Sequence, residues 1–157
     1  MIASNLISAI RNGYQLDWHG IHGFAHWARV RDIGLRLSEE TGANTRVVEL
    51  FAFLHLHDSC RINVNHDPQH GNRAASFAES LRGEAIHLAD EEFELLTYAC
   101  QHHTFGHLEG DITVLTCWDA DRLDLGRVGI LPHPEKLCTS VARYSQMIEW
   151  AYERSIR

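Results

Sequence analysis

The 157-residue sequence has few prolines and no long apolar run, and each shortage excludes a class of protein. No apolar stretch approaches the roughly 18 residues that a membrane span needs, so no membrane association is expected. The first eleven residues lack a basic start and a small-residue cleavage site, which argues against a secretion signal. With three prolines and no low-complexity stretch, the chain is not expected to be disordered. A globular protein remains.

Cysteine pairs and excess positive charge are also missing. The four cysteines are scattered without a CxxC pair, which makes a poor disulfide framework and favours the reducing cytoplasm. The net charge of -7 does not favour binding to the negatively charged backbone of a nucleic acid, so no such partner is expected. What the chain has in excess is histidine, with 12 residues. Because histidine is the commonest protein metal ligand, the excess points to a metal site.

Apolar residues recur at helical spacing along nearly the whole chain, which predicts an all-α fold. The sequence predicts one domain over residues 1–157, a bundle of about six or seven helices. Threonine and valine in 112–123 make a strand conceivable there, but helical neighbours favour a helix. The main predicted segments are helices over 22–40, from 45 to the His57-Asp58 pair, 70–81, 90–102, 112–123 and 135–154, with a loop over 59–69.

His57 and Asp58 are adjacent at the end of the most apolar predicted helix. Burying both side chains without a partner is costly, and a cation resolves that cost, because imidazole and carboxylate are good ligands for first-row metals. Alone, such a pair is more often explained by hydrogen bonds to the backbone. Two further residues favour the metal site: His26, 31 residues upstream on a helix, and Asp121, some 60 residues downstream after an apolar run.

The order H…HD…D, with HxxRV at His26 and ADRL at 120–123, resembles the HD-domain metal-dependent phosphohydrolases over about residues 22–125. The resemblance implies an HD-type helical domain and a metal held by His26, His57, Asp58 and Asp121. It also implies that Asp58 orients the attacking water and that Arg61, at a position where the family often has Lys or Arg, neutralises phosphate.

Several neighbouring residues leave alternatives open. Asp119 is the rival of Asp121 and lies on a different helix face, so only one of them is expected to meet this metal. His55 is expected to point away from His57 and to be structural. His22, His102 and Asp124 are open candidates for acid or base roles.

A second ion is suggested by two further histidine elements. His70 at a helix start and His103 near a helix end match positions that bind a second metal in some branches of the family. His102 could substitute for His103, and a site with a single metal stays open. His22, Arg73 and Arg122 are candidate substrate-binding residues.

The resemblance therefore predicts hydrolysis of a phosphoester or phosphoanhydride, with a small phosphorylated molecule, most simply a nucleotide, as substrate. One or two divalent ions are expected as cofactor, from Mn, Fe, Co, Ni or Zn, with Mg possible. The alternatives are a diiron oxygenase on the same scaffold and a non-catalytic metal-bound sensor or partner-binding module. The apolar face of the closing helix suits either a monomer core or a homodimer contact.

Overall fold

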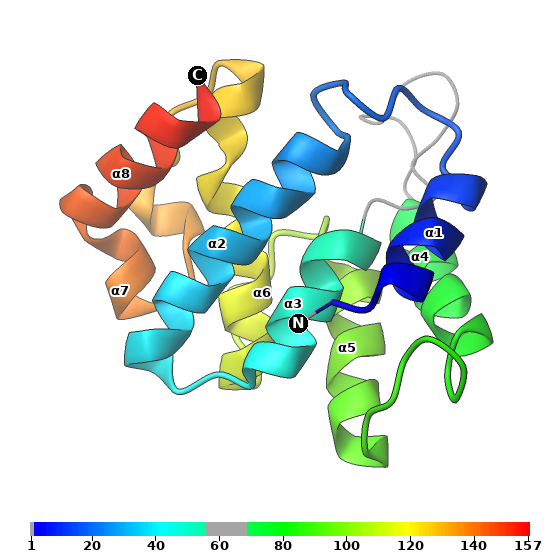
Figure 1. Ribbon diagram of the computed structural model, residues 1–157. Helices are drawn as coiled ribbons and strands as arrows, with labels where there is room; N and C mark the ends of the chain where they lie inside the picture. The colour runs from blue at the N-terminus through cyan, green and yellow to red at the C-terminus, as the bar shows by residue number, and fades with distance from the viewer. Residues whose placement is uncertain (1, 56–68) are drawn as a thin grey trace.

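The computed structural model describes residues 2–55 and 69–157, and over this part of the chain every regular element is a helix (Figure 1). The prediction of an all-α fold is confirmed. The α-helices are α1 (Ser4–Gly13), α2 (Phe24–Thr41), α3 (Thr45–Leu54), α4 (His70–Ser80), α5 (Asp90–His102), α6 (Ile112–Leu123), α7 (Ser140–Arg143) and α8 (Ser145–Ser155). Two 3₁₀ turns, η2 (Leu125–Val128) and η3 (Pro134–Lys136), lie between α6 and α7.

The centre of the fold is α3, which packs against α2, α5 and α6. The helix is apolar around most of its circumference, so it is stable only where other helices cover it. Its buried residues include Val47, Val48, Phe51, Ala52 and Leu54. In Figure 1, α2 begins at the end of the bundle where α3 and α6 finish. Polar residues near those three helix ends are thereby brought together.

The segment 112–123, for which a strand was conceivable, is the helix α6. Asp111 caps its first turn, because the carboxylate accepts a hydrogen bond from the Thr113 N–H at 2.8 Å. Its inner face carries Cys117 and Trp118, both fully buried. Burial against α2, α3 and α5 decides the conformation despite the β-branched residues in the first turns.

The single closing helix predicted over 135–154 is wrong, because η3, α7 and α8 divide this segment. Asp119 accepts hydrogen bonds from the backbone N–H groups of Cys138 and Thr139, at 2.7 and 2.8 Å, and so holds the chain outside a helix there. Tyr144 then adopts an extended conformation (φ -64°, ψ 133°) between α7 and α8. The described residues therefore form eight α-helices rather than six or seven.

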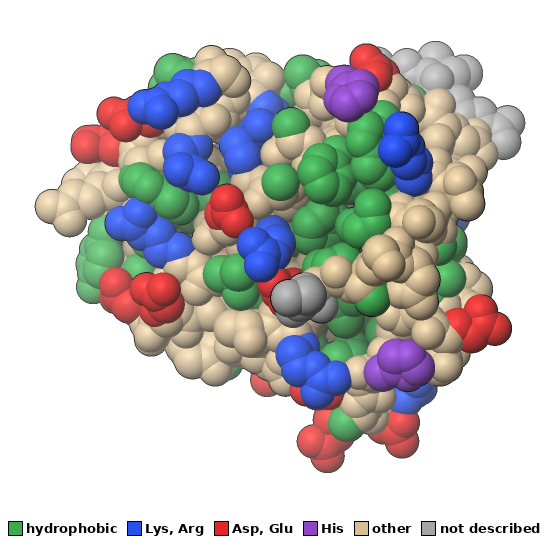
Figure 2. Space-filling view, viewed as in Figure 1, with side chains coloured by type: hydrophobic (Ala, Val, Ile, Leu, Met, Phe, Trp, Pro, Cys, Tyr) green, Lys and Arg blue, Asp and Glu red, His purple; other side chains and the backbone are tan. Residues whose placement is uncertain are grey.

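Two features of the described residues bear on possible partners: the apolarity of the helices and the distribution of surface charge. None of the described helices is long and apolar enough to cross a bilayer. On the face drawn in Figure 2, acidic and basic side chains are interspersed, without a continuous basic patch.

Candidate metal centre

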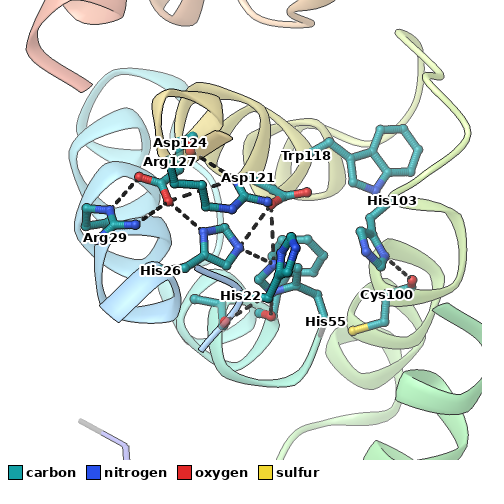
Figure 3. Close-up of polar contacts among 12 residues, drawn as sticks. His22, His26, Arg29, His55, Cys100, His103, Trp118, Asp121, Asp124 and Arg127 are labelled. Atoms are coloured by element: carbon teal, nitrogen blue, oxygen red, sulfur yellow. Dashed lines mark hydrogen bonds and ion pairs between the residues drawn. The ribbon is translucent and has the colours of Figure 1, made fainter. Parts of the chain in front are cut away.

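Three side chains meet where α2 begins and where α3 and α6 end (Figure 3). His26 lies in the first turn of α2, His55 directly follows α3, and Asp121 lies in the last turn of α6. The two Nε2 atoms are 3.2 Å apart, and each lies 3.4 Å from Asp121 Oδ1. Both imidazoles are fully buried. The three atoms form a nearly equilateral triangle inside the protein.

The hydrogen bonds of the outer ring nitrogens fix which atoms carry protons. His26 Nδ1 donates to the Asp124 carboxylate at 2.6 Å. His55 Nδ1 donates to the carbonyl oxygens of Phe51 and Ala52, both at 3.0 Å. In the neutral rings Nδ1 then carries the proton and Nε2 carries a lone pair, which is the tautomer that binds a metal through Nε2.

The charge states agree with ligands ready for a metal. Burial lowers the pKa of His55, so this imidazole is neutral at pH 7. Burial alone raises the pKa of Asp121, but the imidazoles of His55 and His26 and the Arg127 guanidinium outweigh it and hold that pKa well below its usual range. The carboxylate is therefore ionised, and its Oδ1 is buried with no hydrogen-bond partner.

Three converging lone pairs repel one another unless a cation lies between them. Two ligands of a tetrahedral ion with bonds of about 2.0–2.1 Å are about 3.3–3.4 Å apart. An octahedral ion with bonds of about 2.1 Å places adjacent ligands about 3.0 Å apart. The observed separations of 3.2–3.4 Å suit a small divalent ion in tetrahedral geometry, or in octahedral geometry with slightly longer bonds. The three residues fit a metal.

The cluster contains two of the four predicted metal ligands, His26 and Asp121. His57, Asp58 and Arg61 lie outside the described residues. His55, expected to be structural, is the third member of the cluster, because its Nε2 faces His26 and Asp121.

A periodic signal for His55 was present in the sequence. Val48, Ala52 and His55 follow one another at i, i+4 and i+7, the spacing of one helix face. The first two are buried, so the third faces inward as well.

The two aspartates near the end of α6 have separate tasks. Asp121 faces the histidines, whereas Asp119 is fully buried and directed at the segment after η3. In addition to two backbone N–H groups, Asp119 accepts the Thr139 hydroxyl at 2.7 Å. The choice of Asp121 over Asp119 as the residue that meets His26 agrees with the structure.

His70 and His103 form a second buried histidine pair next to the cluster. Their Nε2 atoms are 2.9 Å apart, and the His103 ring lies 5.4 Å, centroid to centroid, from that of His55. His103 Nδ1 donates to the Cys100 carbonyl at 2.6 Å, and burial lowers the pKa of His103 to about 3. Its Nε2 is therefore a lone pair directed at His70. The two histidines that are candidate ligands of a second metal are thus adjacent in the structure.

A close helix contact positions this second pair. A Cβ added to Gly71 would lie 2.7 Å from the carbonyl oxygens of Cys100 and Gln101, so only glycine lets α4 approach α5 this closely. His102 does not join the pair, since its ring packs against Tyr98 at a centroid distance of 4.4 Å. Of the two alternatives, His103 is the residue next to the cluster.

The first cluster is surrounded by Arg29, Arg127 and Asp124, to which the sequence assigned no firm role. Asp124 is fully buried and accepts Arg29 Nε at 2.7 Å and Nη2 at 3.0 Å, in addition to His26. Both Asp124 oxygens are thus engaged, which suits orientation of His26 rather than proton transfer. Arg127, on η2, donates from Nη1 to the Asp124 carbonyl at 2.9 Å. Neither arginine was predicted, because only the fold brings them to the histidines.

The three predicted substrate-binding residues lie in different surroundings. His22 is half-buried, with a buried Nδ1 that has no hydrogen-bond partner. Arg122 lines a cavity of about 560 Å³ that also reaches His103 and Lys136. Arg73 is half-buried on α4, one turn after His70.

No family model, curated protein or solved structure matches the chain. The chemistry of the clustered residues is therefore the ground on which a function can be proposed.

Proposed function

We propose that this protein is a metal-dependent phosphohydrolase that cleaves a phosphoester or phosphoanhydride of a small molecule, most simply a nucleotide. The observation that carries the proposal is the buried triangle of lone pairs from His26, His55 and Asp121. Such a triangle is stable with a divalent cation and costly without one. The H…HD…D resemblance gives that cation its proposed reaction.

The charges around the cluster favour an anionic substrate. Among the described residues, the carboxylates of Asp121 and Asp124 are balanced by the guanidinium groups of Arg29 and Arg127. With neutral imidazoles, a divalent ion adds two positive charges to a buried site. Anionic ligands compensate this excess of positive charge. The proposed anionic ligands are Asp58, which lies outside the described residues, and a phosphoryl group of the substrate.

A bound divalent ion lowers the pKa of a coordinated water toward about 7 and polarises a phosphoryl oxygen. The chain's residues supply the remaining functions. Asp124 keeps His26 in the tautomer that presents Nε2, and the Phe51 and Ala52 carbonyls do the same for His55. In the proposed reaction, Asp58 orients the water and Arg61 neutralises phosphate.

His70 and His103 are proposed to hold a second ion. Their facing nitrogens, 2.9 Å apart, are too close for an ion directly between them, so one ring must move aside or lose its mutual hydrogen bond on binding. Asp58 is proposed to bridge the two ions, as the resemblance implies.

The cavity beside His103 supports a substrate larger than phosphate. Its volume of about 560 Å³ is within the usual range for small-molecule sites. Leu125, Leu131 and Leu137 give it apolar walls, while Arg122 and Lys136 supply positive charge beside the carboxylate of Glu135. A nucleoside fits apolar walls of this kind, with its phosphate toward the histidines.

Metal analysis followed by a hydrolysis screen tests the proposal. The purified protein is expected to bind Mn²⁺, Fe²⁺, Co²⁺, Ni²⁺ or Zn²⁺ and to release phosphate from a panel of nucleoside phosphates. His26→Ala and Asp121→Asn are expected to lose metal and activity, whereas His87→Ala, at an exposed position outside the cavity, retains both. Full metal content and turnover in folded His26→Ala would contradict the assignment.

The same screen separates the two alternatives. Oxygen consumption with an organic substrate and an iron-linked visible spectrum would indicate a diiron oxygenase. Stoichiometric metal without turnover of any phosphorylated metabolite would indicate a sensor or binding module.

A further inference from the structure

Unpartnered polar atoms are concentrated beside the candidate metal centre. Within the described part of the chain, five buried side-chain nitrogen and oxygen atoms have no hydrogen-bond partner. Three of them belong to His22 (Nδ1), Asp121 (Oδ1) and Arg127 (Nε). Asp121 Oδ1 is explained by a metal, but the two nitrogens lie on residues that are not part of the lone-pair triangle.

Arg127 is nine-tenths buried, and its Nε–H is buried without a hydrogen-bond partner. A guanidinium has five N–H donors, and one of them, on Nη1, is donated to the Asp124 carbonyl at 2.9 Å. Nη2 is 4.0 Å from Asp121 Oδ1, too far for a hydrogen bond. Because a buried donor without a partner costs about 1–3 kcal/mol, an arrangement of this kind calls for a ligand.

The charge of Arg127 offsets the two carboxylates, with Nη2 4.0 Å from Asp121 Oδ1 and Nη1 3.9 Å from Asp124 Oδ2, but it makes no hydrogen bond to either carboxylate group. The Asp124 carboxylate takes its hydrogen bonds from Arg29, at 2.7 and 3.0 Å, and from His26 at 2.6 Å. Asp121 is in Coulombic range of Arg127 but receives no hydrogen bond from it. Arg127 is therefore held in ion-pair range of both carboxylates, while its buried Nε–H stays without a hydrogen-bond partner.

The backbone holds Arg127 firmly in this position. A Cβ added to Gly126 would lie 1.9 Å from the Ser155 hydroxyl oxygen and 3.0 Å from the Tyr152 ring, so η2 packs directly against α8. Figure 3 shows Arg127 reaching along Asp121 toward the imidazoles, with the His22 ring beside His55. A preorganised donor of this type is what oxyanion binding requires.

We propose that Arg127 and His22 form an oxyanion site that holds a non-bridging oxygen of the substrate's phosphoryl group next to Asp121. The inference rests on the proposed hydrolase function and names two substrate-binding side chains for it. Arg127 supplies charged donors, and His22 supplies one neutral donor from Nδ1. The ligand class is a tetrahedral oxyanion, and a guanidinium fork matches two of its oxygens.

Titration of the zinc-loaded and metal-free protein with inorganic phosphate tests the site. For Arg127→Gln, the dissociation constant of phosphate is expected to rise about 10- to 100-fold, as for the loss of a charged hydrogen bond. Zinc affinity is expected not to fall, because Arg127 is not a ligand. The matched control is Arg154→Gln, which removes an exposed guanidinium paired with Asp32 at 3.4 Å and is expected to leave phosphate affinity within twofold of the parent.

Arg127→Lys keeps the buried charge and removes the planar fork. It is expected to weaken phosphate about 3- to 10-fold, and it carries the test if Arg127→Gln does not fold. His22→Phe keeps the ring and removes the donor, with an expected loss of about threefold or more. Phosphate affinity within twofold of the parent in folded Arg127→Gln, or in Arg127→Lys where only that variant folds, would overturn the oxyanion site.

The outcome for this site and the outcome for the hydrolase function are distinguishable. Arg127-dependent phosphate binding without hydrolysis of any ester would support the oxyanion site and refute the proposed reaction. Hydrolysis with unchanged KM and kcat in Arg127→Gln would support the reaction and refute the site.

Discussion

Asp124→Asn isolates the effect of orienting a metal ligand, because it changes one atom of a carboxylate that does not itself belong to the lone-pair triangle. In the parent protein Asp124 accepts one hydrogen bond from His26 and two from Arg29, at 2.6 to 3.0 Å, and is fully buried. The amide keeps one acceptor oxygen and places an NH₂ against a donor. Either the contact with Arg29 or the tautomer of His26 must therefore change.

Two magnitudes follow from that geometry. Removing one partner of a buried ion pair costs about 3–5 kcal/mol. Arg29 keeps 19% of its side-chain surface exposed and one amide acceptor, so we expect the free energy of unfolding of the metal-free protein to fall by about 2–3 kcal/mol. Metal affinity is expected to fall about 10- to 100-fold, which corresponds to about 1.4–2.7 kcal/mol.

Urea unfolding followed by circular dichroism measures the first quantity, and calorimetric titration with Zn²⁺ measures the second. Asp119→Asn is the matched control, because Asp119 is equally buried but holds Cys138 and Thr139 instead of a histidine. It is expected to lose stability while zinc affinity stays within twofold. Unchanged zinc affinity in folded Asp124→Asn, or an equal loss in Asp119→Asn, would refute the orienting role.

Three further predictions concern the second histidine pair and the cavity. Gly71→Ala is expected to push α4 away from α5 and to separate His70 from His103. The free energy of unfolding should therefore fall by about 1–3 kcal/mol, and any second equivalent of bound metal should be lost. A variant with unchanged stability and unchanged metal stoichiometry would contradict the close contact. The pKa of His103 is lowered to about 3 from an ordinary value of 6.5, so its contribution to the stability of the metal-free protein is present above pH 6.5 and lost as pH falls toward 3. Urea midpoints for His103→Gln should therefore fall less steeply over that range than those of the parent or of the exposed variant His133→Gln, and parallel curves contradict the shift. Lys136, the only lysine of the chain, lines the cavity, so a saturating nucleoside phosphate should slow its acetylation several-fold by peptide mass spectrometry, and equal rates with and without nucleotide place the substrate elsewhere.

The fold class and most helices could be predicted because they depend on local periodicity. α2, α4, α5 and α6 agree closely with the predicted segments, since each shows apolar residues at helical spacing. The closing segment differs because its breaks arise from a distant residue. Asp119, on α6, fixes the backbone of residues 138–139, and no pattern within 135–154 reports that contact.

The sequence by itself determined that histidines and aspartates would meet at helix ends, with His26 and Asp121 among them. Only the tertiary structure decided which neighbours accompany them. His55 completes the triangle because it directly follows the inner face of α3, and Arg29, Asp124 and Arg127 converge because η2, packed against α8, follows α6 at the end of the bundle where α2 begins. The physical reason is that helical spacing sets the face on which a residue lies, whereas the packing of helices distant in sequence sets which faces meet.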